Sequence, residues 1–130
     1  MKRINTIIGL LLVCIMVVSI IPMNTFATQS RTENFSKNYT LTGDGAKDMC
    51  AIALAQYQKT GSQLGYTEDW CADFVSDCAK LAGLGSKIPA HGAVSGLYQN
   101  TVNAGGKVVS SPQTGDLAII DWNKNGGRWR

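Results

Sequence analysis

The feature that most constrains the fold is a hydrophobic segment at the N-terminus, which is typical of an export signal and not of a folded domain. Two basic residues precede an apolar run over residues 7–21, and Pro22 ends that run. Residues 25–27 read Thr-Phe-Ala, a small-x-small pattern that predicts a signal peptide over residues 1–27 cleaved after Ala27. The run is shorter than the roughly 20 apolar residues that span a bilayer. We therefore expect a secreted protein, with no stable membrane insertion after cleavage.

The remaining residues, 28–130, are enough for one small domain with one hydrophobic core. The full chain has a formal net charge of +3, and its acidic and basic residues are interspersed. This pattern does not indicate a nucleic-acid-binding surface, so we expect no nucleic-acid partner. Residues 28–43 are polar with few aliphatic side chains and predict a flexible linker. We expect a monomer without a cofactor, folded over residues 44–130.

The first predicted helix begins at Asp44, whose side chain is suitable for an N-cap. Apolar residues recur at helical spacing through about residue 59, and Gly61 then supplies a stop. The predicted buried stripe of this helix consists of Cys50, Ala53, Leu54 and Tyr57, widened by Met49 and Ile52. We expect this stripe to pack against the core.

The second predicted helix has a cysteine in its first turn. It runs from residue 69 or 70 to residue 82, and its predicted apolar stripe consists of Cys71, Phe74, Val75, Cys78 and Ala82. The unpaired N–H groups at a helix start carry partial positive charge, which stabilises a thiolate. Because Cys71 lies on the predicted buried stripe, we expect its sulfur to face residues presented by a sheet, as a cysteine hydrolase requires.

After the helices the pattern changes to short runs with turn signals. Residues 93–102 are ambiguous, residues 107–110 predict a short strand, and residues 117–122 predict a strand that is apolar on both faces. Residues 123–127 predict a hairpin loop, and residues 128–130 begin a returning strand. Such a hairpin would leave an apolar edge unpaired. We therefore expect the chain to be a fragment or an interrupted gene product.

Three segments carry a family resemblance: residues 70–75 (WCADFV), residues 93–98 (AVSGLY) and residues 112–120 (PQTGDLAII). In this order they resemble the CHAP family of cysteine, histidine-dependent amidohydrolases/peptidases, which is related to the NlpC-type peptidases. The resemblance covers roughly residues 44–130. It implies an α+β, papain-like fold in which the nucleophile-bearing helix packs on a small antiparallel sheet. It also implies cleavage of amide bonds in bacterial peptidoglycan.

The resemblance assigns roles to individual residues. Cys71 is the nucleophile, and its backbone N–H donates to the oxyanion of the reacting carbonyl. Gly115 and Asp116 match the family's turn, in which Asp116 has a structural role. Tyr66 and Trp70 are candidates for substrate binding, and core packing is the alternative for both.

The resemblance places the catalytic histidine just after Arg130, together with the third polar residue that orients it. The chain therefore matches a family domain that is truncated before its proton acceptor. His91 is the single histidine of the sequence and could substitute as the base. It lies in a loop beside Pro89 and Gly92, however, where an exposed or groove-lining role is the ordinary one.

The other cysteines leave alternatives open. Cys71 and Cys78 are seven residues apart on one helix, which separates their Cα atoms by about 10 Å, beyond the roughly 7 Å that a disulfide tolerates. Cys50 and Cys78 can form a disulfide or remain core thiols. No closely spaced cysteine or histidine pairs predict a zinc site, so we expect no metal.

Three functions remain open from the sequence. The first is a secreted peptidoglycan hydrolase, a cysteine amidase or endopeptidase acting on cell-wall peptide. The second is a catalytically inactive, truncated remnant that at most binds wall peptide. The third is a small secreted structural or adhesion module, in which Cys71 is only a core residue. The resemblance favours the first.

Overall fold

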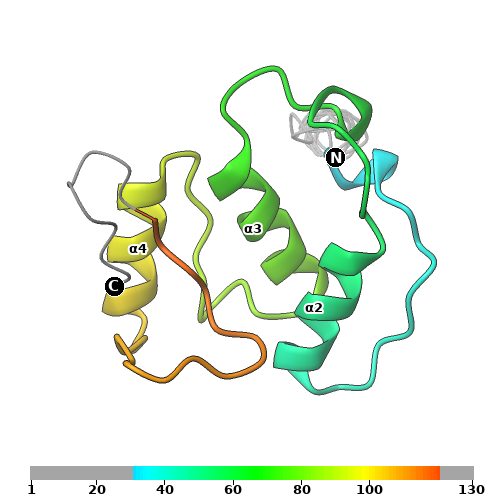
Figure 1. The fold of residues 1–130 in the computed structure, drawn as a ribbon. Coiled ribbons are helices and arrows are strands. Elements are labelled where there is room, and N and C mark those ends of the chain that lie inside the picture. The colour runs from blue at the N-terminus through cyan, green and yellow to red at the C-terminus, as the bar shows by residue number, and fades with distance from the viewer. Residues whose placement is uncertain (1–30, 121–130) are drawn as a thin grey trace, which may run out of the picture. The chain divides into compact units, whose positions relative to one another are not determined.

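The computed structural model describes residues 31–120, which are drawn as a coloured ribbon in Figure 1. The helices of this part are α2 (Gly45–Leu54), α3 (Cys71–Leu81) and α4 (Val94–Asn103), with the short 3-10 helices η1 (Arg31–Asn34) and η2 (Ser62–Leu64). No β-strand occurs among residues 31–120. The expected α+β, papain-like fold with an antiparallel sheet is therefore wrong for the described part of the chain.

The ambiguous segment after the second helix forms α4. Ala93 precedes it in an extended conformation, with φ −106° and ψ 140°, and Leu97 is buried on its inner face. The Thr101 hydroxyl donates to the carbonyl of Leu97 at 2.8 Å, a bond that occupies this hydroxyl within the helix. The chain then leaves α4 through a turn in which Gly106 N–H donates to the carbonyl of Thr101 at 2.9 Å.

The two predicted strands lack partners in the described part. Residues 107–110 are exposed coil. Residues 117–120 alternate between half-buried and exposed positions, and Leu117 packs against the core, which is the side-chain pattern of a strand. A strand also needs a hydrogen-bonded neighbour, and residues 31–120 provide none. The rest of the predicted hairpin, residues 121–130, lies outside the described residues, as does the predicted signal peptide.

The start of α2 confirms the predicted cap. The side chain of Asp44 accepts a hydrogen bond from Lys47 N–H, although the helix ends at Leu54, earlier than expected. The chain continues in turns, and Gln58 has a φ of 67°. Because the helix stops early, Leu54 and Tyr57 are 71% and 78% exposed, so their predicted place in the core is wrong.

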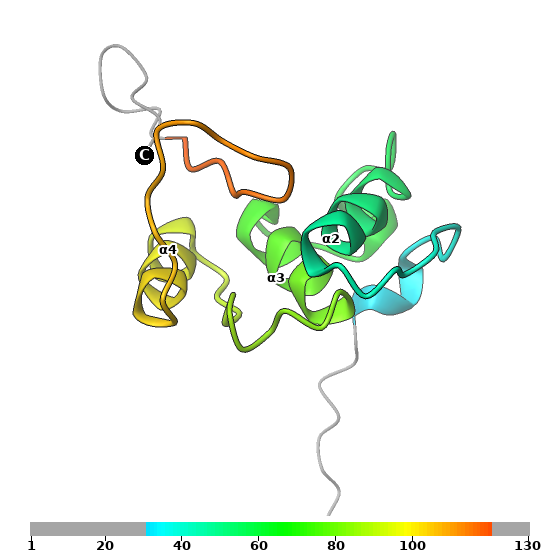
Figure 2. The same ribbon diagram turned by 90° about the horizontal axis from the view of Figure 1, so that it is seen from below.

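The core forms between α2, α3 and the segments before and between them. α3 packs against α2 on one side and α4 on the other, which both views of the ribbon show (Figures 1 and 2). The central buried cluster consists of Phe35, Met49, Ile52, Leu64, Tyr66, Cys78 and Ala79. Within residues 31–120, no helix meets the length and hydrophobicity that a membrane span requires.

The segment expected to be a flexible linker contributes to this core over its described part. Phe35 is only 4% exposed, and its ring lies 5.7 Å from that of Phe74. The buried side chain of Gln56 binds the backbone of Ser36 at two points: its Oε1 accepts from Ser36 N–H at 2.7 Å and its Nε2 donates to Ser36 O at 2.9 Å. One aromatic residue and one buried amide therefore hold a segment whose composition is polar.

Candidate functional site

Cys71 is the first residue of α3, and it is solvent-exposed. The expectation that it lies on the buried stripe is wrong, although the stripe itself exists. Val75 and Ala82 pack against the core and Cys78 is part of it, and Cys71 continues the same face by one more turn. At that turn no other element of residues 31–120 covers the helix enough to bury the cysteine.

The helix start around Cys71 leaves backbone donors without partners inside the helix. The first intrahelical bond runs from Phe74 N–H to the carbonyl of Trp70 at 2.8 Å, and no side chain caps the helix. The N–H groups of Cys71, Ala72 and Asp73 therefore lack intrahelical acceptors. An anion at Cys71 would lie at the positive end of the helix dipole.

Trp70 holds this helix start against the core. Its ring stacks on Tyr66 at 5.6 Å and meets Phe74 edge-on at 5.6 Å. On another side it lies directly against the backbone of Gly61, where a Cβ would be 2.5 Å from the indole Nε1. The indole is thus engaged by packing, which favours the packing alternative for Trp70 over a role in substrate binding.

Tyr66 is also engaged within the fold. It is 3% exposed, and its hydroxyl donates to Oδ2 of Asp77 at 2.7 Å. Burial, followed by the hydrogen bond to Asp77, raises the pKa of the Tyr66 phenol well above its usual value. The hydroxyl already has an acceptor, which favours the core alternative over a part in stabilising an oxyanion.

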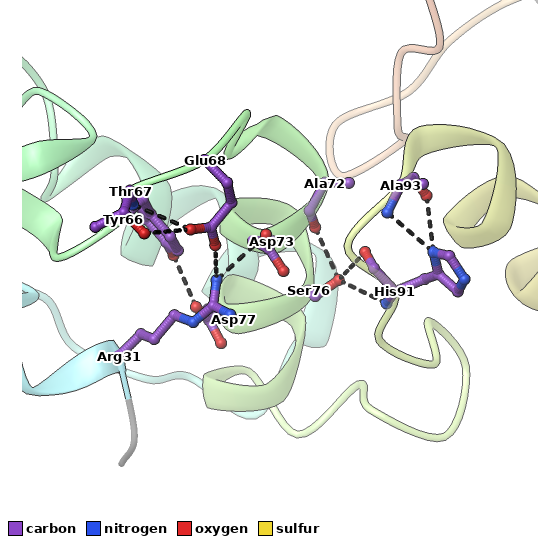
Figure 3. Close-up of polar contacts among 10 residues, drawn as sticks. All are labelled: Arg31, Tyr66, Thr67, Glu68, Ala72, Asp73, Ser76, Asp77, His91 and Ala93. Atoms are coloured by element: carbon purple, nitrogen blue, oxygen red, sulfur yellow. Dashed lines mark hydrogen bonds and ion pairs between the residues drawn. The ribbon is translucent and has the colours of Figure 1, made fainter. Parts of the chain in front are cut away.

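The loop that carries His91 is attached to α3 through its backbone. Ser76 Oγ accepts a hydrogen bond from His91 N–H at 3.3 Å and donates to the carbonyl of Ala72 at 2.8 Å. The imidazole points away from α3 in Figure 3, toward the start of α4. There the ring covers Gly96 so closely that any Cβ on this glycine would overlap it.

Nδ1 of the His91 ring contacts the backbone of Ala93. Nδ1 accepts a hydrogen bond from Ala93 N–H at 2.9 Å. The carbonyl of Ala93 also lies 3.2 Å from Nδ1, but the backbone N–H can only donate, so we assign the shorter contact, in which Nδ1 is the acceptor. The nitrogen lone pair that a general base needs is therefore occupied.

Gly115 and Asp116 form a tight turn that packs on α2. Gly115 has a φ of 96°, and a Cβ there would lie 2.5 Å from that of Ala46. Oδ2 of Asp116 accepts from Gln113 N–H at 2.8 Å, and its own N–H donates to the carbonyl of Gln113 at 3.1 Å. Only glycine meets both the backbone and the space requirement at position 115, and the Asp116 carboxylate closes the turn.

One charged cluster, whose carboxylates flank Cys71 in the sequence, was not predicted from the sequence. The guanidinium of Arg31 pairs with the carboxylate of Glu68 and lies 3.2 Å from Oδ2 of Asp73. Figure 3 shows this cation between the two carboxylates, one from the loop before α3 and one from its first turn. Arg31 is distant in sequence from both partners and lies in a segment expected to be a linker, so no local pattern revealed the pairing.

The cysteines of the described part are free thiols, so Cys50 and Cys78 do not form a disulfide in this structure. Burial, and to a lesser extent the charge of Asp77, raises the pKa of the Cys78 thiol to about 12. Cys78 is therefore a core residue, whereas Cys50 is half-buried. Within residues 31–120, no three His, Cys, Asp or Glu side chains come together as metal ligands would.

No protein-family model, curated protein or solved structure matches the chain. The functional interpretation therefore depends on the motifs in the sequence and on the geometry of the described residues.

Proposed function

We propose that this chain carries the nucleophile of a secreted cysteine amidase or endopeptidase that acts on bacterial cell-wall peptide. The observation that carries the proposal is the position of Cys71, exposed as the first residue of α3 beside backbone donors without intrahelical partners. The three segments that resemble the CHAP family support the reaction class. The export-type N-terminus supports a substrate outside the membrane.

The geometry fits the first step of amide cleavage. The Cys71 sulfur, as thiolate, attacks the carbonyl carbon, and a C–S bond forms while the C–O π electrons move to oxygen. The N–H groups at the start of α3 can donate to that oxygen. Collapse of the intermediate breaks the C–N bond and expels the amine, which needs a proton. Water then hydrolyses the thioester.

Proton transfer is the step that the described residues do not provide. His91 is the single histidine of the chain, and its Nδ1 lone pair accepts from Ala93 N–H. Residues 1–130 alone are thus expected to bind or acylate at Cys71 without turning over cell walls. This observation favours the second candidate, a domain that binds wall peptide without cleaving it, for the chain acting alone.

Site-specific thiol labelling tests the proposed function. The full chain is treated with iodoacetamide at pH 6, and the alkylation rate of Cys71 is followed by mass spectrometry of its peptide. The reference is an exposed thiol away from any helix start, introduced by Ser110→Cys in a Cys71→Ser background; Ser110 is exposed coil. We expect Cys71 to react about tenfold faster than this reference, because the N–H groups at a helix start stabilise an anionic sulfur.

Equal rates at Cys71 and at the reference thiol would show that Cys71 is not activated, and would leave the structural-module alternative. Turbidity of purified cell walls is the second measurement. Clearing by the full chain that is lost in Cys71→Ala would support the enzyme and contradict the assignment of His91 as structural. Pull-down of the chain by walls without clearing is the result expected of the binding domain.

A further inference from the structure

The charged cluster beside the helix start suggests a control on the reactivity of Cys71. We propose that Arg31 is a positioning residue for Cys71, which holds and neutralises the two carboxylates on either side of the cysteine in the sequence. In this way it keeps the start of α3 favourable for a thiolate. The inference depends on the proposed function only in taking Cys71 as the nucleophile.

Arg31 contacts both segments that meet at Cys71. Its Nη1 pairs with Oε1 of Glu68, three residues before the cysteine, and lies 3.2 Å from Oδ2 of Asp73, two residues after it. The guanidinium carbon is 5.7 Å from the centre of the Tyr66 ring, within the range of a cation–π contact. One cation therefore joins the loop before α3 to the first turn of α3 (Figure 3).

The packing of η1 holds Arg31 in place. The carbonyl of Asn34 accepts from Nζ of Lys59 at 2.9 Å, and the side chain of the next residue, Phe35, is buried in the core. Arg31 is about half exposed, but its backbone belongs to an element that these contacts fix. An arginine on a fixed backbone loses less entropy when it pairs than one on an unattached segment.

The charges around the helix start determine the effect of losing Arg31. Glu68 and Asp69 lie in the loop before α3, Asp73 lies in its first turn, and the His91 loop packs on the same helix further along. Hydrogen bonds from Thr67, and then the charge of Arg31, lower the pKa of the Glu68 carboxyl, so this group is an anion at neutral pH.

Asp77, one turn beyond Asp73, accepts from the Tyr66 hydroxyl. Without Arg31, the carboxylates of Glu68 and Asp73 would lose their shared cation. Nearby negative charge disfavours a thiolate. We therefore expect loss of Arg31 to reduce the thiolate fraction at Cys71 even if the fold is retained.

The experiment follows alkylation of Cys71 in the full chain between pH 5 and 9 at low salt. The variants are Arg31→Gln, Arg31→Lys and the double variant Arg31→Gln with Asp73→Asn. The control is Lys37→Gln, an exposed lysine of the same segment that makes no ion pair with the described residues. Peptide mapping separates the label on Cys71 from that on Cys50 and Cys78.

For Arg31→Gln we expect the pH of half-maximal alkylation to rise by about half a unit, which slows the reaction at pH 6 about threefold. Arg31→Lys retains the charge, so its pH shift should be at most half of that in Arg31→Gln. The double variant, which also lacks the Asp73 carboxylate, should likewise show at most half of that shift. A purely structural role of Arg31 would not predict recovery on removing a second partner. Lys37→Gln should match the unmodified chain.

Either of two results would overturn the inference: an unshifted profile in Arg31→Gln, or an equal shift in the single and double variants. Failure of the proposed function is a different result, in which Cys71 of the unmodified chain reacts no faster than the Ser110→Cys reference. The shift between variants can be measured in that case too, because it does not depend on the absolute rate.

Discussion

The indole of Trp70 lies directly on the backbone of Gly61, so the residue before Cys71 packs in a space that only glycine leaves open. A Cβ at position 61 would be 2.5 Å from Nε1 and 2.7 Å from Cδ1 of the indole. The backbone of Gly61 has an ordinary helical φ of −54°, so space and not conformation is what requires glycine here. This contact links η2 to the start of α3.

The variant Gly61→Ala is therefore expected to displace Trp70 and to destabilise the fold by about 1–3 kcal/mol, the usual cost of overpacking. Urea unfolding followed by tryptophan fluorescence measures the change. The matched control is Gly85→Ala, since a Cβ at Gly85 meets nothing within 4 Å. Equal stability of the two variants would contradict the close contact between the Trp70 indole and Gly61. We also expect slower alkylation of Cys71 in Gly61→Ala only, because Trp70 forms the N-terminal boundary of α3.

The hydrogen bonds of Gln56 allow a second test, which concerns the predicted linker over residues 28–43. Its amide makes both hydrogen bonds to the backbone of Ser36, and a third to the carbonyl of Ile52 at 3.0 Å. Gln56→Leu keeps the volume but leaves these backbone groups without their partner, at an expected cost of about 1–3 kcal/mol in the free energy of unfolding. The exposed helical residue Gln99 provides the control, Gln99→Leu, which should change stability by less than about 0.5 kcal/mol.

Sequence reasoning succeeded where the signal is local. Asp44 caps α2, and the second predicted helix matches α3 within one or two residues at each end, because caps and helical periodicity depend on neighbours along the chain. It failed where the partner is distant. The strand pattern over residues 117–120 has no sheet to join in the described part, since pairing is not encoded in the segment itself.

The candidate site shows the same division. The helix start at Cys71 follows from the local pattern, but its exposure depends on which elements cover the first turn. The pairing of Arg31 with Glu68 and Asp73 joins charges that are far apart in the sequence, and the position of the His91 ring depends on a glycine in the following helix. The exposure of Cys71, the pairing of Arg31 and the position of the His91 ring could not be derived without knowing how the elements pack.

The lowered pKa of the Asp48 carboxyl predicts how the stability of the fold depends on pH. A backbone hydrogen bond from Thr42 is the main cause that lowers the pKa of this carboxyl below its ordinary 3.8, helped by the Thr42 hydroxyl and by Gly43 N–H and opposed by burial. A carboxyl whose pKa is lower in the folded state contributes stability above its unfolded pKa and loses it as the pH falls through the folded value. We therefore expect stability to fall below about pH 4.

The measurement is the midpoint of urea unfolding between pH 2 and 7, in the unmodified chain and in Asp48→Asn. The variant cannot lose a proton at this position, so its profile should be flatter below pH 4 and lie lower at pH 7. Parallel profiles that differ by a constant amount would show that the Asp48 charge makes no contribution.

Cys78 provides a test of the core that is independent of function. Its thiol is buried and has a pKa of about 12, so it should resist alkylation at pH 8 in the folded chain and react once urea unfolds it. Cys78→Ser places a hydroxyl in the same apolar surroundings and should cost about 1–3 kcal/mol. Cys50→Ser, at a half-buried position, should cost less. Labelling of Cys78 as fast as Cys71 under native conditions would contradict the packing of α2 against α3.

Two variants of His91 distinguish a structural role of its imidazole from a catalytic role. Its Nδ1 accepts the N–H of Ala93, two residues on, just before α4 begins. Asparagine makes the same bond to the N–H two residues on, so His91→Asn should retain stability while His91→Ala loses about 0.5–1.5 kcal/mol. Neither variant should alter the rate at which Cys71 is alkylated, because the imidazole faces away from α3 (Figure 3). A slower reaction of Cys71 in both variants, with stability unchanged in His91→Asn, would instead assign the imidazole to the chemistry.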